Sequence, residues 1–213
     1  MKEFITIKAN VETEITEKKS KFIAHLYYIE SVEEAEKFIK EIKKKYHDAR
    51  HNCIAYRVIE EEQLIEKSSD DGEPSGTAGA PMLSILQKNN LVNVLIVVTR
   101  YFGGILLGTG GLVRAYSSSL VQAIDESEKI RKCIGLELEV LLEYSELETF
   151  KYYCKNNSIY VADIIYSENI VCKIQIEVNE KQKLMTDFEN KKINIKEIKE
   201  LSKKIITKSI WKR

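Results

Sequence analysis

Residues 70–81 read DDGEPSGTAGAP, and residues 93–119 read NVLIVVTRYFGGILLGTGGLVRAYSSS. Eight of the nine glycines and both prolines of this 213-residue chain lie between Gly72 and Gly111. Glycine is favoured where the backbone takes a positive φ or approaches another group closely, and it costs conformational entropy elsewhere. We therefore expect the specialised loops of the protein to lie in this segment.

The same segment is free of acidic residues. No Asp or Glu occurs from Pro74 to Ile124, whereas Arg100 and Arg114 are both present. Only six of the 33 basic residues are arginines, so an arginine here is expected to serve through its planar, bidentate guanidinium. Glycine-rich loops with arginines and no acids favour a surface that binds phosphate or another anion.

Composition places the chain among ordinary globular proteins, with 44% hydrophobic and 31% charged residues. Its formal net charge of zero argues against a strong, non-specific DNA-binding protein. The N-terminus lacks the apolar region of a secretory signal, and the longest apolar run, Val94–Val98, is too short to cross a membrane. The four cysteines form no C-x-x-C pair, which argues against zinc. We expect a cytoplasmic protein with no cofactor and no membrane contact.

Residue patterns predict alternating strands and helices in the first part of the chain. Ser31 and Glu34 form a capping box before apolar positions at helical spacing that continue to Tyr46. Thr77 is predicted to cap a helix that ends near residue 90, and Thr109 or Gly110 to open a long helix that ends near residue 129. Segments rich in β-branched and aromatic residues predict strands at 4–7, 21–29, 51–60 and 92–101.

After Arg131 the composition of the chain changes, because Gly135 is the only glycine and there is no proline. The predicted order is strand 133–144, helix 146–157, strand 159–167, strand 169–178, helix 180–190 and strand 193–208. This βαββαβ order is the ferredoxin-like one. The sequence therefore predicts an α+β protein with one domain at 1–131 and a second at 132–213.

The second glycine cluster follows a buried strand and opens a helix, as a phosphate-binding loop does. Its glycines have the spacing of a P-loop, but Thr109 and Gly110 replace the Lys-Ser/Thr pair, which excludes a Walker-type NTPase. Arg114 is predicted in the first helical turn, where a cation opposes the helix dipole unless an anion binds there. Alternatively, Arg114 pairs with an acid of the first loop, Asp70, Asp71 or Glu73.

These patterns define a candidate site for phosphate groups. Arg100, Tyr101 and Arg114 are the candidate side chains, and His51 and Arg57 are expected to line the same groove. The candidate backbone amides are those of Gly103, Gly104, Gly108, Thr109, Gly110 and Gly111. The three acids Asp70, Asp71 and Glu73 admit either a magnesium site or a tight turn paired with the second loop, and no other metal ligand set is expected.

Four motifs in a fixed order resemble the YigZ/IMPACT family: SKFIAH (20–25), HNCIAYR (51–57), DDGEPSGTAGAP (70–81) and VVTRYFGGILLGTGGLVRAY (97–116). The resemblance covers residues 20–116. It implies a first domain with the β-α fold of some ribosomal proteins and of domain IV of elongation factor G. It also implies a ferredoxin-like second domain, as in bacterial two-domain members. Eukaryotic relatives are regulators of translation that act by contact with partner proteins.

The sequence favours a non-enzymatic, translation-linked regulatory protein that binds RNA or the ribosome through a groove lined by glycine and arginine. A protein partner in translation is a further candidate, although the eukaryotic relatives carry a different extra domain and their partner contact does not transfer to this chain. One alternative is an enzyme acting on a small phosphorylated or nucleotide ligand with magnesium. The other is a protein-interaction module in which the glycine loops are purely structural.

Overall fold

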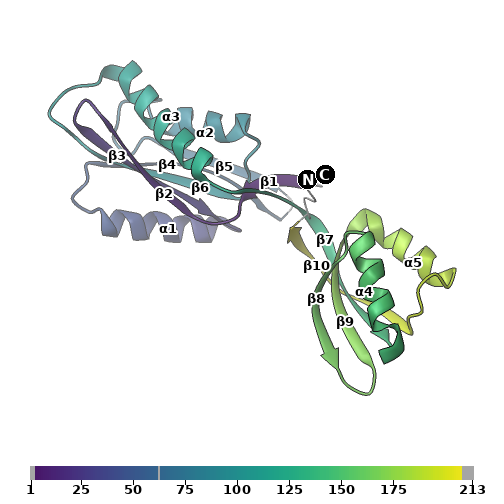
Figure 1. The fold of residues 1–213 in the computed structure, drawn as a ribbon. Coiled ribbons are helices and arrows are strands. Elements are labelled where there is room, and N and C mark those ends of the chain that lie inside the picture. The colour runs from purple at the N-terminus through teal and green to yellow at the C-terminus, as the bar shows by residue number, and fades with distance from the viewer. Residues whose placement is uncertain (1–2, 62, 208–213) are drawn as a thin grey trace. The chain divides into compact units, whose positions relative to one another are not determined.

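The computed structural model describes residues 3–61 and 63–207, which divide into two compact units (Figure 1). One unit comprises residues 4–130 and the other mainly residues 131–207. With two sheets and five α-helices among the described residues, the protein is α+β. Within these residues, no helix is both long and apolar enough to span a membrane.

The first unit is built on a five-stranded sheet with the order β2-β3-β6-β4-β5, in which every neighbouring pair is antiparallel. Strand β6 is central and almost completely buried, which matches its run of β-branched residues. The strand bounds are β2 (Val11–Glu17), β3 (Ser20–Tyr28), β4 (His51–Glu60), β5 (Gln63–Ser69) and β6 (Val94–Tyr101).

Helices cover both faces of this sheet (Figure 1). Helix α1 (Val32–Lys45) packs on one face through Ile39 and Ile42. Helices α2 (Gly79–Lys88) and α3 (Gly108–Glu126) pack on the opposite face through residues such as Met82 and Leu120. Because side chains alternate along a strand, β4 and β6 present His51 and Arg100 on the same face as α2 and α3.

The second unit contains the elements expected in the order βαββαβ. They are β7 (Lys129–Leu142), α4 (Leu147–Asn156), β8 (Tyr160–Tyr166), β9 (Ile170–Glu177), α5 (Lys181–Glu189) and β10 (Glu197–Thr207). The strands of this unit lie in the order β10-β7-β9-β8. Strand β1 (Glu3–Ile7) also pairs with β7, and all of β1 except Glu3 belongs to the first unit. Alternate residues of β7, such as Leu138 and Val140, form a core with residues of both helices, including Phe150 and Leu184.

Two strands of the first unit were not expected from the sequence. Strand β2 (VETEITE) is largely polar and β5 (QLIEKSS) is mostly exposed, since both lie at the edges of the sheet. Thr77 does not cap α2, because its hydroxyl donates to the carbonyl of Pro74, and the cap residue is Ala78. Helix α3 begins at Gly108, earlier than the sequence indicated.

Candidate functional site

A cavity of about 420 Å³ lies beside the first turn of α3 in the first unit. We call it the α3 cavity. Its polar and charged lining comes from three segments that are distant in sequence and comprises Arg50, His51, Glu73, Arg100 and Thr109. Its apolar lining comprises Pro74, Phe102, Leu106, Leu107 and Leu112, and the backbone of Gly72 and Gly108 completes it. The topology thus brings both glycine loops to one site.

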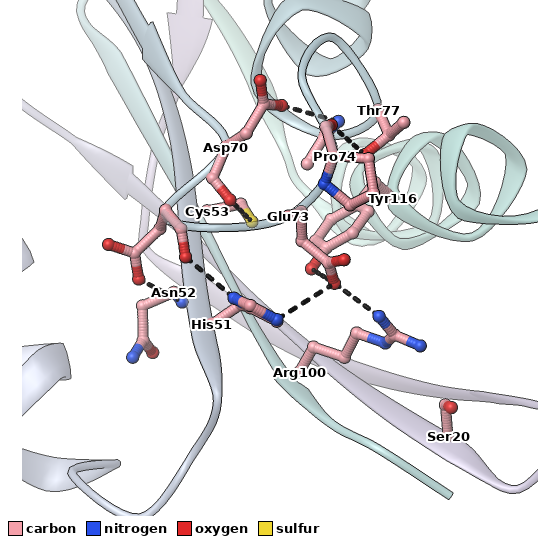
Figure 2. Close-up of polar contacts among 12 residues, drawn as sticks. Ser20, His51, Asn52, Cys53, Asp70, Glu73, Pro74, Thr77, Arg100 and Tyr116 are labelled. Atoms are coloured by element: carbon pink, nitrogen blue, oxygen red, sulfur yellow. Dashed lines mark hydrogen bonds and ion pairs between the residues drawn. The ribbon is translucent and has the colours of Figure 1, made fainter. Parts of the chain in front are cut away.

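Glu73 is the only acid in this lining, and it is buried. Its Oε1 accepts a hydrogen bond from Arg100 Nη1 at 2.5 Å and one from the Tyr116 hydroxyl at 2.9 Å (Figure 2). Burial, followed by the neighbouring Cys53 and Glu73, raises the pKa of Tyr116 above its ordinary value, so Tyr116 is a neutral donor. Arg100 and Glu73 therefore form a buried ion pair that joins β6 to the first glycine loop.

His51 is oriented by the backbone of the same loop. Its Nδ1 lies 2.8 Å from the carbonyl oxygen of Asp71, and its Nε2 lies 3.9 Å from Glu73 Oε1 (Figure 2). A carbonyl oxygen only accepts hydrogen bonds, so Nδ1 carries a hydrogen and donates it. Nε2 of His51 consequently faces the Glu73 carboxylate and the cavity.

Two groups at the α3 cavity have unused hydrogen-bonding capacity. Arg100 is only 6% exposed, and its buried Nε has no hydrogen-bond partner among the described residues. Helix α3 begins without a side-chain cap and without an acid in its first turn. The first backbone N–H groups of a helix lack internal partners and carry partial positive charge. With Arg50 and Arg100 against Glu73, the fixed charges also leave the cavity net positive.

The first two acids of the first loop are committed to neighbouring groups. The Asp70 carboxylate accepts hydrogen bonds from the amides of Gly76, Ala78 and Gly79. Burial opposes ionisation of Asp70, but these three amides outweigh it and hold its pKa below the ordinary value. Asp71 accepts from Lys43 and from the amide of Asn52.

With Glu73 bound to Arg100 and Tyr116, the three acids point to different partners instead of converging. Among residues 3–61 and 63–207, no cluster of three or more acidic, His or Cys groups is placed to hold a metal ion. A nucleophilic thiol is not offered here either, since burial raises the pKa of Cys53 to about 12.

A smaller hollow of about 200 Å³ is adjacent to the α3 cavity, and Leu107 lines both spaces. We call it the Lys18 hollow; its polar lining is Glu17, Lys18, Arg114 and Ser118. Arg114 is the seventh residue of α3, beyond the first turn, so the dipole argument for this residue was wrong. Its guanidinium nevertheless reaches back, because a Cβ built on Gly110 would lie 3.8 Å from Arg114 Nη1.

Contact between two loops brings Lys18 to this place. A Cβ built on Gly103 would lie 2.0 Å from the carbonyl carbon of Lys19, so only glycine allows this approach. Lys18 and Lys19 both have positive φ in the tight turn between β2 and β3. The turn between β2 and β3 therefore packs directly against the loop that leads into α3.

The structure separates the residues proposed from the sequence into three groups. Arg100, His51, Glu73, Gly108 and Thr109 share the α3 cavity, whereas Gly111 and Arg114 line the Lys18 hollow. The remaining proposed residues line neither space; these are Arg57, Tyr101, Gly103, Gly104, Gly110, Asp70 and Asp71.

Two of these remaining side chains have structural partners instead. The guanidinium of Arg57 donates to Glu66 and to the carbonyl oxygen of Leu91. The hydroxyl of Tyr101 donates to Asp48. Arg57 therefore ties β4 to β5 and to the segment after α2, and Tyr101 ties β6 to the segment before β4.

The candidate set drawn from the sequence omits Lys18, Arg50, Phe102 and Leu106. Phe102 is an aromatic that can stack on a base, but core packing is the default interpretation of such a residue. Arg50 carried one signal, since arginine is rare in this lysine-rich chain and Arg50 precedes a predicted strand. Phe102 and Leu106 carried another, as apolar residues inside a glycine-rich loop, where they are 44% and 83% exposed. No local sequence signal indicated that Lys18 belongs to the site, because strand β2, which ends at Glu17, was itself not predicted.

Residues 18–124 match the family model of the Impact N-terminal domain, and this range contains both glycine loops and every residue of the two spaces except those of β2. IMPACT family member YvyE of Bacillus subtilis (strain 168) is 40% identical over 197 residues, which cover 91% of this chain and 90% of the relative. The chain belongs to the IMPACT family.

Other IMPACT family members are similar to smaller parts of this chain. YigZ of Escherichia coli (strain K12) is 42% identical over 131 residues, covering 61% of this chain and 64% of the relative. Protein IMPACT of Rattus norvegicus is 38% identical over 98 residues, covering 44% of this chain and 30% of the relative. A crystal structure described as that of a hypothetical protein aligns with a TM-score of 0.61 and 31% identity, covering 92% of this chain and 97% of that chain.

Proposed function

We propose that this IMPACT family member is a non-enzymatic, translation-linked regulatory protein that binds RNA, free or in the ribosome, at the α3 cavity and the Lys18 hollow. The translational part of the proposal comes from the family resemblance. The resemblance also implies a fold, which we propose for this chain: a first domain like domain IV of elongation factor G, followed by a ferredoxin-like domain. The strand order β10-β7-β9-β8 in the second unit supports the latter.

One observation carries the RNA-binding part. The uncapped, acid-free start of α3 adjoins a cavity that also contains Arg100, whose buried Nε lacks a partner among the described residues. A phosphate group offers several acceptor oxygens and negative charge. It therefore satisfies both the free amides of a helix start and an arginine.

Cations around this point support the same proposal. Arg50, Lys18 and Arg114 line the two spaces, and their side chains have no hydrogen bond or ion pair within the described residues. Several other cations of the unit are paired, for example Lys43 with Asp71 and Lys67 with Glu36. Unpaired cations beside a helix start are available to phosphates, whereas paired ones are already neutralised.

The magnesium-dependent enzyme has less support. A metal would have to displace Lys43 from Asp71, Arg100 from Glu73 and three backbone amides from Asp70. Breaking a buried ion pair by itself costs about 3–5 kcal/mol. We therefore place the enzyme behind the RNA-binding protein.

Co-sedimentation with ribosomes across a salt series tests the proposed function. The variant Arg50→Ala/Arg114→Ala removes two exposed, unpaired cations without touching the buried pair of Arg100 and Glu73. We expect wild-type binding to fall steeply with salt, and the variant to bind more weakly with a shallower salt dependence. Lys37→Ala/Lys40→Ala on α1 is the control for loss of two positive charges. Binding that is insensitive to salt, or equal in both double variants, contradicts the proposal.

A further inference from the structure

The α3 cavity has one half suited to an anion and one half suited to an apolar ring. Resting on the function proposed above, we infer that the cavity receives a single unstacked nucleotide of single-stranded RNA. The base enters the apolar half and its phosphate meets the start of α3. A neighbouring phosphate of the same strand lies in the Lys18 hollow.

The apolar half points to a base. Phe102 is 44% exposed and Leu106 is 83% exposed, although both are large apolar side chains. They line the cavity together with Pro74, Leu107 and Leu112. An exposed aromatic ring beside cationic groups is the usual platform on which an unpaired base stacks.

The size of the cavity suits one nucleotide. Its volume of about 420 Å³ is at the small end of ligand pockets, which fits one nucleotide better than a base pair. Bases of a duplex are stacked and paired, so a duplex enters such a cavity only after a base is extruded, at a cost of a few kcal/mol. Single strands bear a much smaller cost.

The polar half holds the phosphate of that nucleotide. Gly108 and Thr109 belong to the first turn of α3, whose amides have no side-chain cap, and both line the cavity. Arg100, 6% exposed with an unpartnered Nε, and the exposed Arg50 line the same space. The helix start is therefore accompanied by two arginines, the buried Arg100 and the exposed Arg50, and a phosphate group complements their positive charge.

The Lys18 hollow supplies the second contact. Leu107 lines both spaces, so the two are adjacent. Lys18 and Arg114 have no ion-pair partner among the described residues, and the Arg114 guanidinium lies near Gly110 in the first turn. A strand whose backbone crosses the start of α3 therefore meets cations on both sides. This arrangement suits consecutive phosphates and not an isolated mononucleotide.

Fluorescence anisotropy with a labelled ten-nucleotide RNA, free or annealed to its complement, tests the inference on the full chain. We expect the single strand to bind at least tenfold more tightly than the duplex. Phe102→Leu should weaken single-strand binding about five- to tenfold through lost stacking, and Phe102→Tyr should restore it. Tyr152→Leu, at a 68% exposed aromatic of α4, is the control and should change nothing.

Lys18→Ala/Arg114→Ala should weaken the single strand and reduce its salt dependence, while uridine monophosphate should compete only at far higher concentration. Circular dichroism and unfolding curves confirm that each variant is folded. Equal affinity for single strand and duplex, or no effect of Phe102→Leu, overturns the single-nucleotide inference and leaves the proposed function intact. Absence of both RNA and ribosome binding at low salt overturns both.

Discussion

The two glycine-rich loops of the first unit both lead into a helix, but they treat its N-terminus in opposite ways. Before α2, the loop supplies its own anion: the Asp70 carboxylate accepts from Ala78 and Gly79 at 2.9 and 2.8 Å and from Gly76 at 2.8 Å. Before α3, no side chain caps the helix and no acid lies in its first turn. The first loop is closed on itself, and the second is open to the α3 cavity.

The two helices differ in how the unpaired amides of their first turns are satisfied. Free amides at the start of a helix favour a negative group. In α2 that group is part of the chain, so the loop contributes to stability. In α3 no side chain of the described residues accepts from the first amides, because Glu73, the acid of the cavity lining, is bonded to Arg100 and Tyr116 instead. Unpaired cations adjoin this helix start. The first loop is consequently expected to govern folding, and the second to govern binding.

Asp70→Asn should break the closed loop and have the largest effect on stability. The amide side chain offers a donor where the carboxylate offered an acceptor, so at least one of the three backbone amides loses its partner. Hydrogen bonds to charged groups are worth about 1.5–3 kcal/mol each. We expect unfolding free energy to fall by about 2–3 kcal/mol in urea titrations, with ribosome binding retained by the folded protein. Asp125→Asn, at an exposed acid of α3, is the control.

The contribution of Asp70 should also depend on pH. Its pKa lies below the ordinary value of 3.8, so ionised Asp70 stabilises the folded state above that value. That contribution is lost as the pH falls through the lowered folded-state pKa. Unfolding curves from pH 7 to pH 3 should therefore show the gap between wild type and Asp70→Asn narrowing below about pH 4. A gap that stays constant to pH 3 contradicts the role assigned to the carboxylate.

Thr109→Asp should make the second loop resemble the first. The new carboxylate lies in the first turn of α3, where it should stabilise the helix by about 0.3–1 kcal/mol. It also occupies the place proposed for phosphate, so single-stranded RNA should bind several-fold more weakly in anisotropy titrations. Thr109→Asn has nearly the same shape without the charge and should keep most of the affinity. Equal loss in both variants would indicate a steric effect instead of a charge effect.

Glycines of the two loops should differ in a smaller way. A Cβ on Gly79 would lie 2.7 Å from the backbone nitrogen of Ser69, whereas one on Gly110 would meet only Arg114 Nη1 at 3.8 Å. Gly110→Ala should therefore stabilise α3 by about 0.5 kcal/mol, measured by thermal unfolding, because alanine is the better helix former. The same variant should reduce RNA affinity slightly by crowding the helix start. A loss of stability would contradict the open space beside Gly110.

Local signals predicted those elements whose determinants are close in sequence. The Ser31 half of the predicted capping box is present, with the Glu34 amide donating to Ser31 Oγ at 3.1 Å, whereas the Glu34 carboxylate accepts from the amide of Glu30 instead of Ser31. Among the apolar positions at helical spacing, Ala35, Ile39 and Ile42 are buried. Strands β2 and β5 escaped prediction because edge strands bury little, so their sequences resemble loops. Their formation depends on β3 and β4, which supply the hydrogen bonds.

The candidate site divides in the same manner. The sequence by itself determined that the chain belongs with IMPACT proteins, that all but one of its glycines lie between residues 72 and 111, and that this segment lacks acids after Glu73. The positive φ angles of Lys18 and Lys19 lie outside this segment and were not expected. Composition and glycine spacing are local properties, so they can be read directly. Only the tertiary structure decided that Arg100 pairs with Glu73, that Arg57 has a structural role, and that Lys18 reaches α3. Those outcomes depend on which strands are neighbours, and strand pairing joins residues that no local pattern relates.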